Sequence, residues 1–232
     1  ESLLFLSDVL PTAYWSVEHS GMKEGDTVAV LGSGPIGLMV QKFAWMKGAK
    51  RVIAVDHLPY RLNHAVKMNK VEAYNFEEYD HMGKYIREIT NGGVDVVIDC
   101  VGMDGKMSTL EKVGQKLKLQ GGTLSALDIG IDAVRKFGTI QLTGVYGSNY
   151  NMFPLGNIFE RNINIKTGQA PVVHYMPNIY EMITKELEAL YNSMGISKEV
   201  HAYGEEILEA LKERFDRIDM IAEYNQAKVV KA

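Results

Sequence analysis

The sequence predicts an α/β fold, in which a doubly wound parallel sheet of six strands is followed by a C-terminal helical appendage. Over the first 184 residues, short apolar runs alternate with amphipathic stretches, as strands alternate with crossover helices. The runs are apolar almost without interruption, which is typical of parallel strands covered on both faces. After residue 184 the glycine-rich turns stop, and Glu, Lys, Ala and Leu dominate. We therefore predict two domains, 1–184 and 185–232.

The first half of the chain is expected to begin with a short helix over 7–21, which has Pro11 in its first turn. An apolar helix beginning near Pro35 and ending at Gly48 follows the first strand. The stretch 59–70 has apolar residues at helical spacing, so it is expected to be a crossover helix. The first three strands are expected at 27–31, 51–56 and 72–76.

The second half continues the alternation. A helix over 79–90 is stopped by Asn91-Gly92-Gly93, and further helices are expected over 103–119 and 127–136. The last three strands are expected at 94–99, 139–144 and 162–166.

Beyond residue 184, an amphipathic stripe predicts the helical appendage. An ordinary packed helix is favoured over a coiled coil or a partner-binding helix. The stripe consists of Ile207, Leu208, Leu211, Phe215, Ile218 and Ala222.

A glycine turn lies between the first two predicted strands. It reads Gly32-Ser33-Gly34-Pro35-Ile36-Gly37, and an acid, Asp56, ends the next strand about 20 residues later. Gly32 permits a sharp turn, Gly34 lets a diphosphate approach the backbone, and Gly37 allows the helix to pack closely on the strand. The helix start offers free N–H groups to the diphosphate, and the acid accepts hydrogen bonds from a ribose. This is the dinucleotide-binding pattern of a Rossmann fold.

Two other interpretations of the turn stay open at this point. One is an S-adenosylmethionine site, which also combines a glycine turn with an acid, and the other is a βα turn with a purely structural role. The flanking strands and the spacing to Asp56 favour the dinucleotide. A carboxylate at this position also repels a 2′-phosphate, so we predict NAD rather than NADP.

The composition excludes several classes of function. The chain has 232 residues, of which 46% are hydrophobic, enough for a packed core. Its net charge of -4 favours neither nucleic acid nor an anionic membrane, and no apolar run is long enough to span a bilayer. The one cysteine, Cys100, excludes an internal disulfide and fits a reducing, cytoplasmic compartment. Because the chain opens with Glu1 in mid-pattern, we expect it to begin inside a larger protein.

Five motifs are spread over residues 4–183. They are Leu6–Tyr14, Gly25–Leu38, Asp99–Gly102, Leu142–Gly147 and Lys166–Val172. Together they resemble the cofactor domain of zinc-dependent medium-chain alcohol dehydrogenases, and in particular the branch that includes NAD-linked formaldehyde dehydrogenases. The resemblance implies oxidation of a small alcohol or aldehyde, with a zinc ion on the substrate oxygen and hydride transfer to NAD.

The resemblance places Asp8 at the position of the third zinc ligand of this branch, and the other ligands lie outside the chain. For a lone Asp, a helix N-cap or a solvated loop acid is the alternative, but the motif Ser-Asp-x-Leu-Pro-Thr around it favours the ligand. Thr12 is implied to lie near the nicotinamide ring as a catalytic residue.

Further residues are assigned to the cofactor by resemblance. Arg61 would pair with the adenosine ribose or a phosphate, unless it is only an exposed cation of its helix. The loop 168–170 matches one that closes on the cofactor; alternatively it only turns the chain. The expected cofactor-binding residues are Gly32, Gly34, Pro35, Ile36, Gly37, Asp56, Arg61, Val101, Gly102, Thr143, Gly144, Val145, Gly168, Gln169 and Ala170.

The remaining metal-binding or nucleophilic residue types are assigned structural roles. Cys100 follows an apolar strand and is expected to be a buried structural thiol rather than a nucleophile. The histidines form no ligand cluster and are expected at the surface or at helix ends. They are His19, His57, His64, His81, His174 and His201.

The chain departs from the family at both ends. The upstream catalytic domain and the four cysteines of the usual structural zinc lobe are absent, so we expect NAD binding without turnover. The tail 186–232 does not match and faintly resembles the N-terminal helices of aluminium-resistance or methionine γ-lyase-like proteins, without a Schiff-base lysine motif. A fused, truncated or misassembled reading frame would explain both ends.

Oligomeric state and two alternative functions stay open. Relatives pair through the edge strand near 162–166, so a homo-oligomer is one outcome. The alternatives are a non-catalytic nucleotide-binding module whose helical tail recruits a protein partner, and an S-adenosylmethionine-dependent transferase.

Overall fold

The computed structural model describes residues 2–101, 124–144 and 153–194. The chain divides into two compact units, one of residues 12–170 and one of residues 1–11 with 171–232. The predicted division at 184/185 falls inside a single helix, α8 (Val172–Met194), and stays a prediction. The predicted helix over 103–119 and the tail beyond 194 lie outside the described residues.

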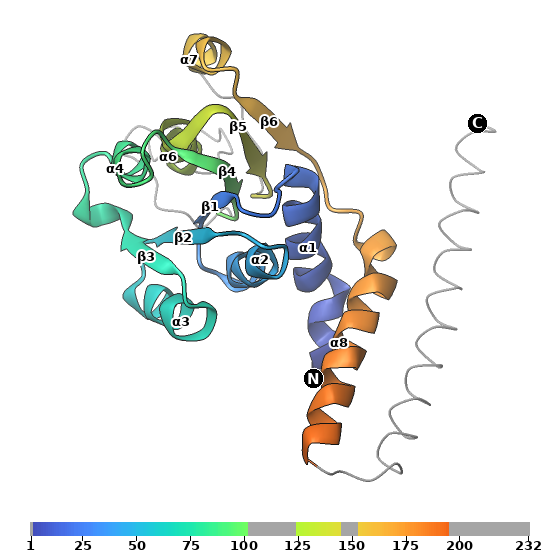
Figure 1. Cartoon of the computed structure of the whole chain (residues 1–232). Coiled ribbons are helices and arrows are strands. Elements are labelled where there is room, and N and C mark those ends of the chain that lie inside the picture. The colour runs from blue at the N-terminus through green and yellow to red at the C-terminus, as the bar shows by residue number, and fades with distance from the viewer. Residues whose placement is uncertain (1, 102–123, 145–152, 195–232) are drawn as a thin grey trace, which may run out of the picture. The chain divides into compact units, whose positions relative to one another are not determined.

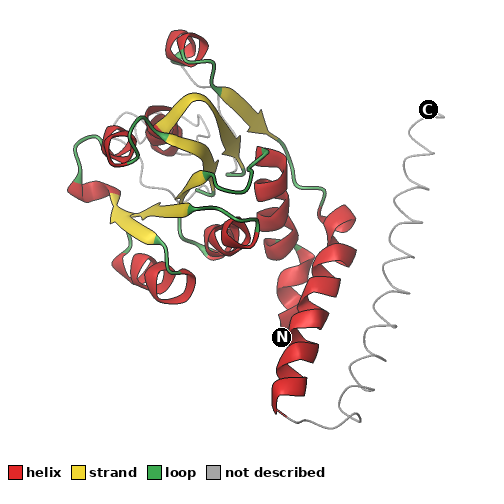
Figure 2. Ribbon diagram, viewed as in Figure 1, coloured by secondary structure: helices red, strands yellow, loops and turns green. Residues whose placement is uncertain are grey.

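The larger unit is built on a six-stranded sheet in which every neighbouring pair is parallel (Figures 1 and 2). The strand order is β3-β2-β1-β4-β5-β6. The chain starts at the centre, winds outward to β3 and then crosses to β4 on the other side of β1. This confirms the predicted doubly wound fold, whose switch point opens a crevice between the carboxyl ends of β1 and β4. The strands are β1 (Thr27–Leu31), β2 (Arg51–Asp56), β3 (Glu72–Asn75), β4 (Val94–Asp99), β5 (Val134–Leu142) and β6 (Asn164–Thr167).

Helices cover both faces of the sheet (Figure 1). On one face α2 (Pro35–Met46) packs beside α3 (Pro59–Asn69), and on the other α4 (Met82–Ile89) packs beside α6 (Leu124–Ala133). A Cβ added at Gly130 of α6 would lie 3.2 Å from Val97 Cγ1 and 3.6 Å from Leu31 Cδ1, so α6 lies directly on β4 and β1. Residues 28–31 and 52–55 are buried throughout, because helices cover both sides of these strands.

Two further helices contribute residues to this unit. The helix α1 (Val9–Ser20) contacts α2 through an edge-to-face pair of Tyr14 and Phe43, whose ring centroids are 5.4 Å apart. The short α7 (Leu155–Glu160) leads into β6. A one-turn 3-10 helix, η2 (Phe76–Glu78), follows β3.

The predicted helix over 127–136 is wrong at its end. Residues 134–136 begin β5 instead, where Val134 is fully buried and pairs with Val94 of β4. The strand then bulges, with Phe137 at a φ of 59°, before regular pairing resumes at Thr139. The third strand also ends one residue earlier than predicted, because the Asn75 side chain accepts a hydrogen bond from Glu77 N–H and starts η2.

The smaller unit contains η1 (Ser2–Ser7), a 3-10 helix that packs against α8. The helix α8 continues through Pro177 and Thr184. In the parts of the chain that the structure describes, no helix has both the length and the apolar composition needed to cross a bilayer.

Candidate functional site

The glycine turn has the geometry that its sequence predicts. Gly32 has a φ of 88°, and a Cβ added to it would lie 3.1 Å from the carbonyl oxygen of Cys100. A Cβ added at Gly37 would lie 1.9 Å from the Gly32 carbonyl oxygen, so only glycine allows α2 to start this close to β1. The first and third glycines are therefore required by packing within the protein.

The second glycine has a different environment. Gly34 is the N-cap of α2 with a φ of −74°, which any residue can adopt. A Cβ added there would meet nothing closer than Arg61 Nη1 at 3.9 Å. The first turn of α2, beginning at Pro35, has N–H groups without intrahelical partners. A ligand can therefore approach the backbone at Gly34 because no side chain occupies that space.

The carboxylate of Asp56 lies at the carboxyl end of β2 and is only 4% exposed. Its Oδ2 accepts a hydrogen bond from Ser33 N–H of the glycine turn at 2.8 Å. Its Oδ1 accepts from His57 N–H at 2.7 Å and from Leu58 N–H at 3.0 Å. Three backbone N–H groups thus fix the orientation of the acid and tie it to the turn.

Two basic side chains flank this carboxylate. Arg61 Nη1 lies 3.7 Å from Asp56 Oδ2, and His57 Nδ1 lies 3.5 Å from Asp56 Oδ1. The Arg61 side chain is 37% exposed, and its Nε donates to Tyr60 Oη at 3.1 Å. The guanidinium is therefore held beside the cleft but remains accessible to a ligand.

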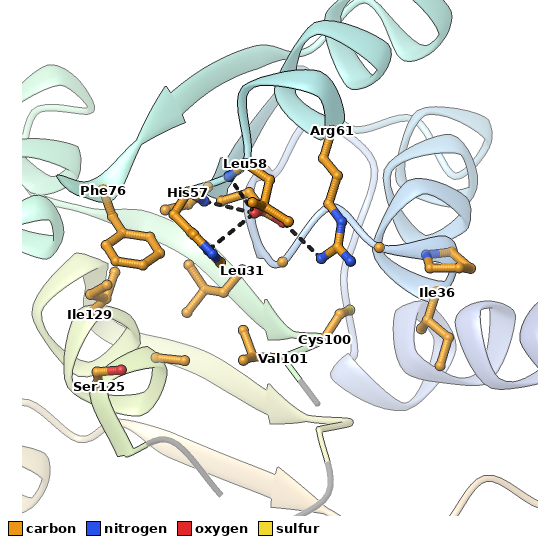
Figure 3. Close-up of a pocket in the computed structure, with 16 residues that line it drawn as sticks. Leu31, Ile36, His57, Leu58, Arg61, Phe76, Cys100, Val101, Ser125 and Ile129 are labelled. Atoms are coloured by element: carbon orange, nitrogen blue, oxygen red, sulfur yellow. Dashed lines mark hydrogen bonds and ion pairs between the residues drawn. The ribbon is translucent and has the colours of Figure 1, made fainter. Parts of the chain in front are cut away.

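These groups line a cleft of about 400 Å³. One end is mainly apolar, with Phe76 and Ile129 near Ser125, and the other end holds Arg61 and Ile36 at the start of α2 (Figure 3). The full lining is Leu31, Gly32, Gly34, Pro35, Ile36, Val55, Asp56, His57, Leu58, Arg61, Phe76, Cys100, Val101, Ser125, Ala126 and Ile129. The cleft thus combines an apolar slot, a buried carboxylate and a helix N-terminus.

The carboxyl ends of β4 and β5 are joined through Asp99, which is fully buried. Its side chain accepts from Val101 N–H at 3.0 Å, and its carbonyl accepts from Thr143 N–H and Gly144 N–H at 2.9 and 3.0 Å. A Cβ at Gly144 would lie 2.3 Å from the Val101 carbonyl oxygen. Glycine at this position therefore allows the two strand ends to meet.

A short hydrogen-bond chain connects two other predicted site residues. Thr143 Oγ1 donates to Ser16 Oγ at 2.8 Å, and Ser16 Oγ donates to the Thr12 carbonyl at 2.6 Å. These bonds connect the residue after β5 to Thr12 and Ser16 of α1. Thr12 is 8% exposed and lies outside the lining of the described cleft.

The structure gathers about half of the predicted cofactor residues around one cleft. Those in its lining are Gly32, Gly34, Pro35, Ile36, Asp56, Arg61 and Val101. Gly37 packs against the backbone of Gly32, and Thr143 and Gly144 follow the end of β5. Gly168, with a φ of 152°, Gln169 and Ala170 follow β6 and do not line the cleft. Gly102 and Val145 lie outside the described residues.

Cys100 lines the cleft and is half-buried. Burial raises its pKa well above the usual value, and the nearby Asp99 carboxylate raises it further. A protonated thiol is a weak nucleophile. The raised pKa argues against a nucleophilic role, but Cys100 is half-buried at the cleft rather than buried as predicted.

Several lining residues were not predicted from the sequence. His57, expected at the surface or at a helix end, lies just before α3 and also lines the cleft. Its position directly after the strand-ending acid is a signal for the site. Phe76 likewise follows the end of β3. No local signal identifies Ser125, Ala126 and Ile129, because they reach the cleft only through the packing of α6 on the sheet.

The proposed zinc ligand Asp8 belongs to the smaller unit and directly precedes α1. An N-cap of α1 would lie at the same position, so the structure is equally consistent with Asp8 as a helix N-cap. Among the described residues, no group of three His, Cys, Asp or Glu side chains is arranged to hold a metal ion.

Comparison with known proteins adds independent information. Residues 35–124 match the family described as zinc-binding dehydrogenase. An uncharacterized zinc-type alcohol dehydrogenase-like protein of Bacillus subtilis strain 168 is 61% identical over 184 residues, which cover 79% of this chain and 49% of that protein. A glutathione-independent formaldehyde dehydrogenase of the same strain is 28% identical over 196 residues, covering 78% of this chain and 45% of that protein.

Solved structures show the same architecture. The alcohol dehydrogenase TADH from Thermus sp. ATN1 superposes with a TM-score of 0.63 at 28% identity, covering 75% of this chain and 44% of that chain. The chain thus spans about half the length of the relatives that it matches.

Proposed function

The chain carries a cofactor-domain segment of the zinc-dependent medium-chain alcohol dehydrogenase family, and from this premise we propose that its cleft binds NAD. The observation that carries the proposal is the hydrogen bond from Ser33 N–H to Asp56 Oδ2. It joins a turn suited to a diphosphate to an acid suited to a ribose, and these two groups are adjacent in a dinucleotide.

The diphosphate fits the open side of the glycine turn. It would lie on Gly34 and the first N–H groups of α2, where the helix dipole favours negative charge. Arg61 Nη1 would lie 3.9 Å from a Cβ at Gly34, so it supplies a cation on the same side of the turn. Charge and available space therefore agree at this end of the cleft.

The adenosine fits the other end. The Asp56 carboxylate retains acceptor capacity beyond its three backbone donors and would accept from ribose hydroxyls. The adenine ring would occupy the apolar slot beside Phe76 and Ile129. The carboxylate also supports NAD over NADP, because a 2′-phosphate would approach a buried negative charge.

The chemistry that NAD supplies when bound is acceptance of a hydride at the nicotinamide ring. The residues of this chain would hold the cofactor in place while that occurs. By the family resemblance, Thr12, Val101 and Val145 belong to the nicotinamide end. The Ser16 hydroxyl connects Thr12 to Thr143, another expected cofactor-binding residue. Their role would be to orient the ring and exclude water.

Zinc does not fit the described residues as a complete site, because they provide no group of three ligands. We keep Asp8 as one proposed ligand, to be joined by ligands from outside this domain. Metal analysis of a complete enzyme with Asp8→Ala, compared with the unchanged enzyme, tests the assignment; equal zinc content would remove Asp8 from the site.

The activity of the complete protein is proposed as oxidation of a small alcohol or aldehyde, in a homo-oligomer. The relatives' printed names support the substrate class. A cytoplasmic location and the absence of nucleic-acid and membrane partners are proposed from the net charge of -4 and the single cysteine.

Isothermal calorimetry of the purified chain tests the proposed function. NAD should bind with one site per chain, and AMP should compete with it. S-adenosylmethionine should give no heat, which separates a dehydrogenase segment from a transferase. A well-folded sample without NAD affinity would overturn the assignment.

A non-catalytic nucleotide-binding module remains the second candidate, since cofactor binding alone does not distinguish it from an enzyme. The two differ in the sequence that adjoins this chain. A Cys and His zinc-ligand pattern upstream of Glu1 would support the enzyme.

A further inference from the structure

A buried chain of side-chain hydrogen bonds runs behind the glycine turn. Gln41 of α2 is 0% exposed and uses both ends of its amide. Its Nε2 donates to Ser33 Oγ at 3.2 Å, and its Oε1 accepts from Asn69 Nδ2 at 3.0 Å. Asn69, the last residue of α3, also donates to the Leu38 carbonyl at 2.8 Å. These hydrogen bonds therefore connect the end of α3 to the glycine turn through a buried side chain of α2.

The direction of these hydrogen bonds is fixed by the protein. The Leu38 carbonyl can only accept, so it is the Asn69 amide nitrogen that faces it. The same nitrogen then requires the oxygen of Gln41, and the Gln41 nitrogen is left to face Ser33. One orientation of both amides satisfies every contact.

This series of hydrogen bonds ends at the proposed cofactor site. Ser33 is 0% exposed. Its hydroxyl oxygen accepts a hydrogen bond from Gln41 Nε2, and its backbone N–H donates to Asp56 Oδ2 at 2.8 Å. Gln41 itself does not line the cleft. If one partner of a buried hydrogen bond is removed, the other partner stays buried without a hydrogen bond, which is unfavourable. These bonds therefore hold the turn in one position.

We propose that Gln41 is a positioning residue that sets the spacing between the glycine turn and the Asp56 carboxylate. The inference rests on the proposed function, because that spacing matters for a ligand that contacts both groups. A dinucleotide places its diphosphate on the turn and its ribose on the acid. AMP carries the ribose but lacks the diphosphate, so it depends less on the spacing.

The test compares Gln41→Met, which keeps side-chain length and removes both hydrogen-bonding groups, with the unchanged chain. The Kd for NAD should rise about tenfold, and the Kd for AMP by no more than about twofold. Thr90→Val is the matched control, because Thr90 Oγ1 donates to the Ile86 carbonyl at the end of α4, away from the cleft. It removes a side-chain hydrogen bond and should leave both Kd values unchanged.

Ser33→Ala provides a second variant that removes only the last link and leaves Gln41 buried. It should change the ratio of the two Kd values in the same direction, and adding Gln41→Met to it should cause little further change. If Gln41→Met does not fold, Ser33→Ala decides the result. Equal weakening of NAD and AMP would overturn the proposal, because it would indicate a general loss of structure.

Hydrogen exchange in the cofactor-free chain separates this inference from the proposed function. In Gln41→Met the Ser33 amide should exchange at least about tenfold faster, with no such change in Thr90→Val. If the unchanged chain binds no NAD but Ser33 exchange still accelerates, the function assignment fails and the positioning role stands. If NAD binds and Ser33 exchange is unchanged, the positioning role fails.

Discussion

Gly34 and Gly37, at the N-cap and in the first turn of α2, belong to the same glycine motif but have different neighbours. Gly37 faces the backbone of Gly32, with 1.9 Å between a Cβ and the carbonyl oxygen. Gly34 faces open space, with the nearest atom at 3.9 Å. A methyl group at Gly37 would therefore disturb folding. A methyl group at Gly34 would instead occupy the space proposed for the diphosphate.

Matched alanine substitutions test this difference. Gly37→Ala should lower the free energy of unfolding by roughly 2–4 kcal/mol, because the backbone of Gly32 must move. Gly34→Ala should change it by less than about 1 kcal/mol and weaken NAD binding at least tenfold. Urea unfolding and calorimetry measure the two quantities. Full NAD affinity in Gly34→Ala would contradict the placement of the diphosphate.

Asp56 shows how a carboxylate is matched to its donors. Asparagine at this position would keep an oxygen for His57 N–H and Leu58 N–H but turn its NH₂ toward Ser33 N–H. Asp56→Asn should therefore raise the Kd for NAD about tenfold and reduce the proposed preference for NAD over NADP. Calorimetry with both cofactors measures the change. An unaltered NADP-to-NAD ratio would mean that the charge of Asp56 does not select the cofactor.

At the scale of secondary structure, the amino ends of three strands are tied together on the side opposite the cleft. Asp95 of β4 accepts from Thr27 N–H of β1 at 2.8 Å and from Arg135 Nε of β5 at 2.6 Å. Burial alone would raise the pKa of Asp95, but these two donors outweigh it and lower the pKa below its ordinary value. The carboxylate therefore contributes stability that depends on pH.

The sign of this dependence follows from the lowered pKa. The stabilisation is complete above the ordinary Asp pKa and is lost as the pH falls through the lower folded-state pKa. Asp95→Asn should cost about 1 kcal/mol at pH 7, and the difference from the unchanged protein should shrink as the pH falls below about 4. Urea unfolding across this range measures it. A difference that does not change with pH would contradict the ionised pair.

The elements also show what sequence patterns can and cannot predict. The glycine turn, Asp56 and the strand 94–99 are recognisable because each carries its signal in a few adjacent residues. The start of β5 was missed because Val134 has its strand partner, Val94, far away in the chain. The same reason hides the α6 wall of the cleft and the Gln41 amide, whose partners are brought together only by folding.

For the whole molecule, the proposed function makes folding and cofactor binding interdependent. All lining residues of the described cleft belong to the unit of residues 12–170. They come from β1, β2, α2, α3, η2 and α6, from the glycine turn, and from the residues that follow β2 and β4. A ligand that contacts several of these elements stabilises them together, because it binds only when they are assembled.

NAD at about 100 times its Kd should raise the free energy of unfolding of this unit by about 2.7 kcal/mol. In the full chain, hydrogen exchange should slow most at Gly32–Leu38 and at the ends of β2 and β4, whose N–H groups and side chains surround the cleft. The amides of α8 belong to the other unit and should exchange at the same rate with and without NAD if the two units open independently. Equal protection of α8 would mean that both units unfold as one, whereas no protection of the glycine turn would contradict cofactor binding in this cleft.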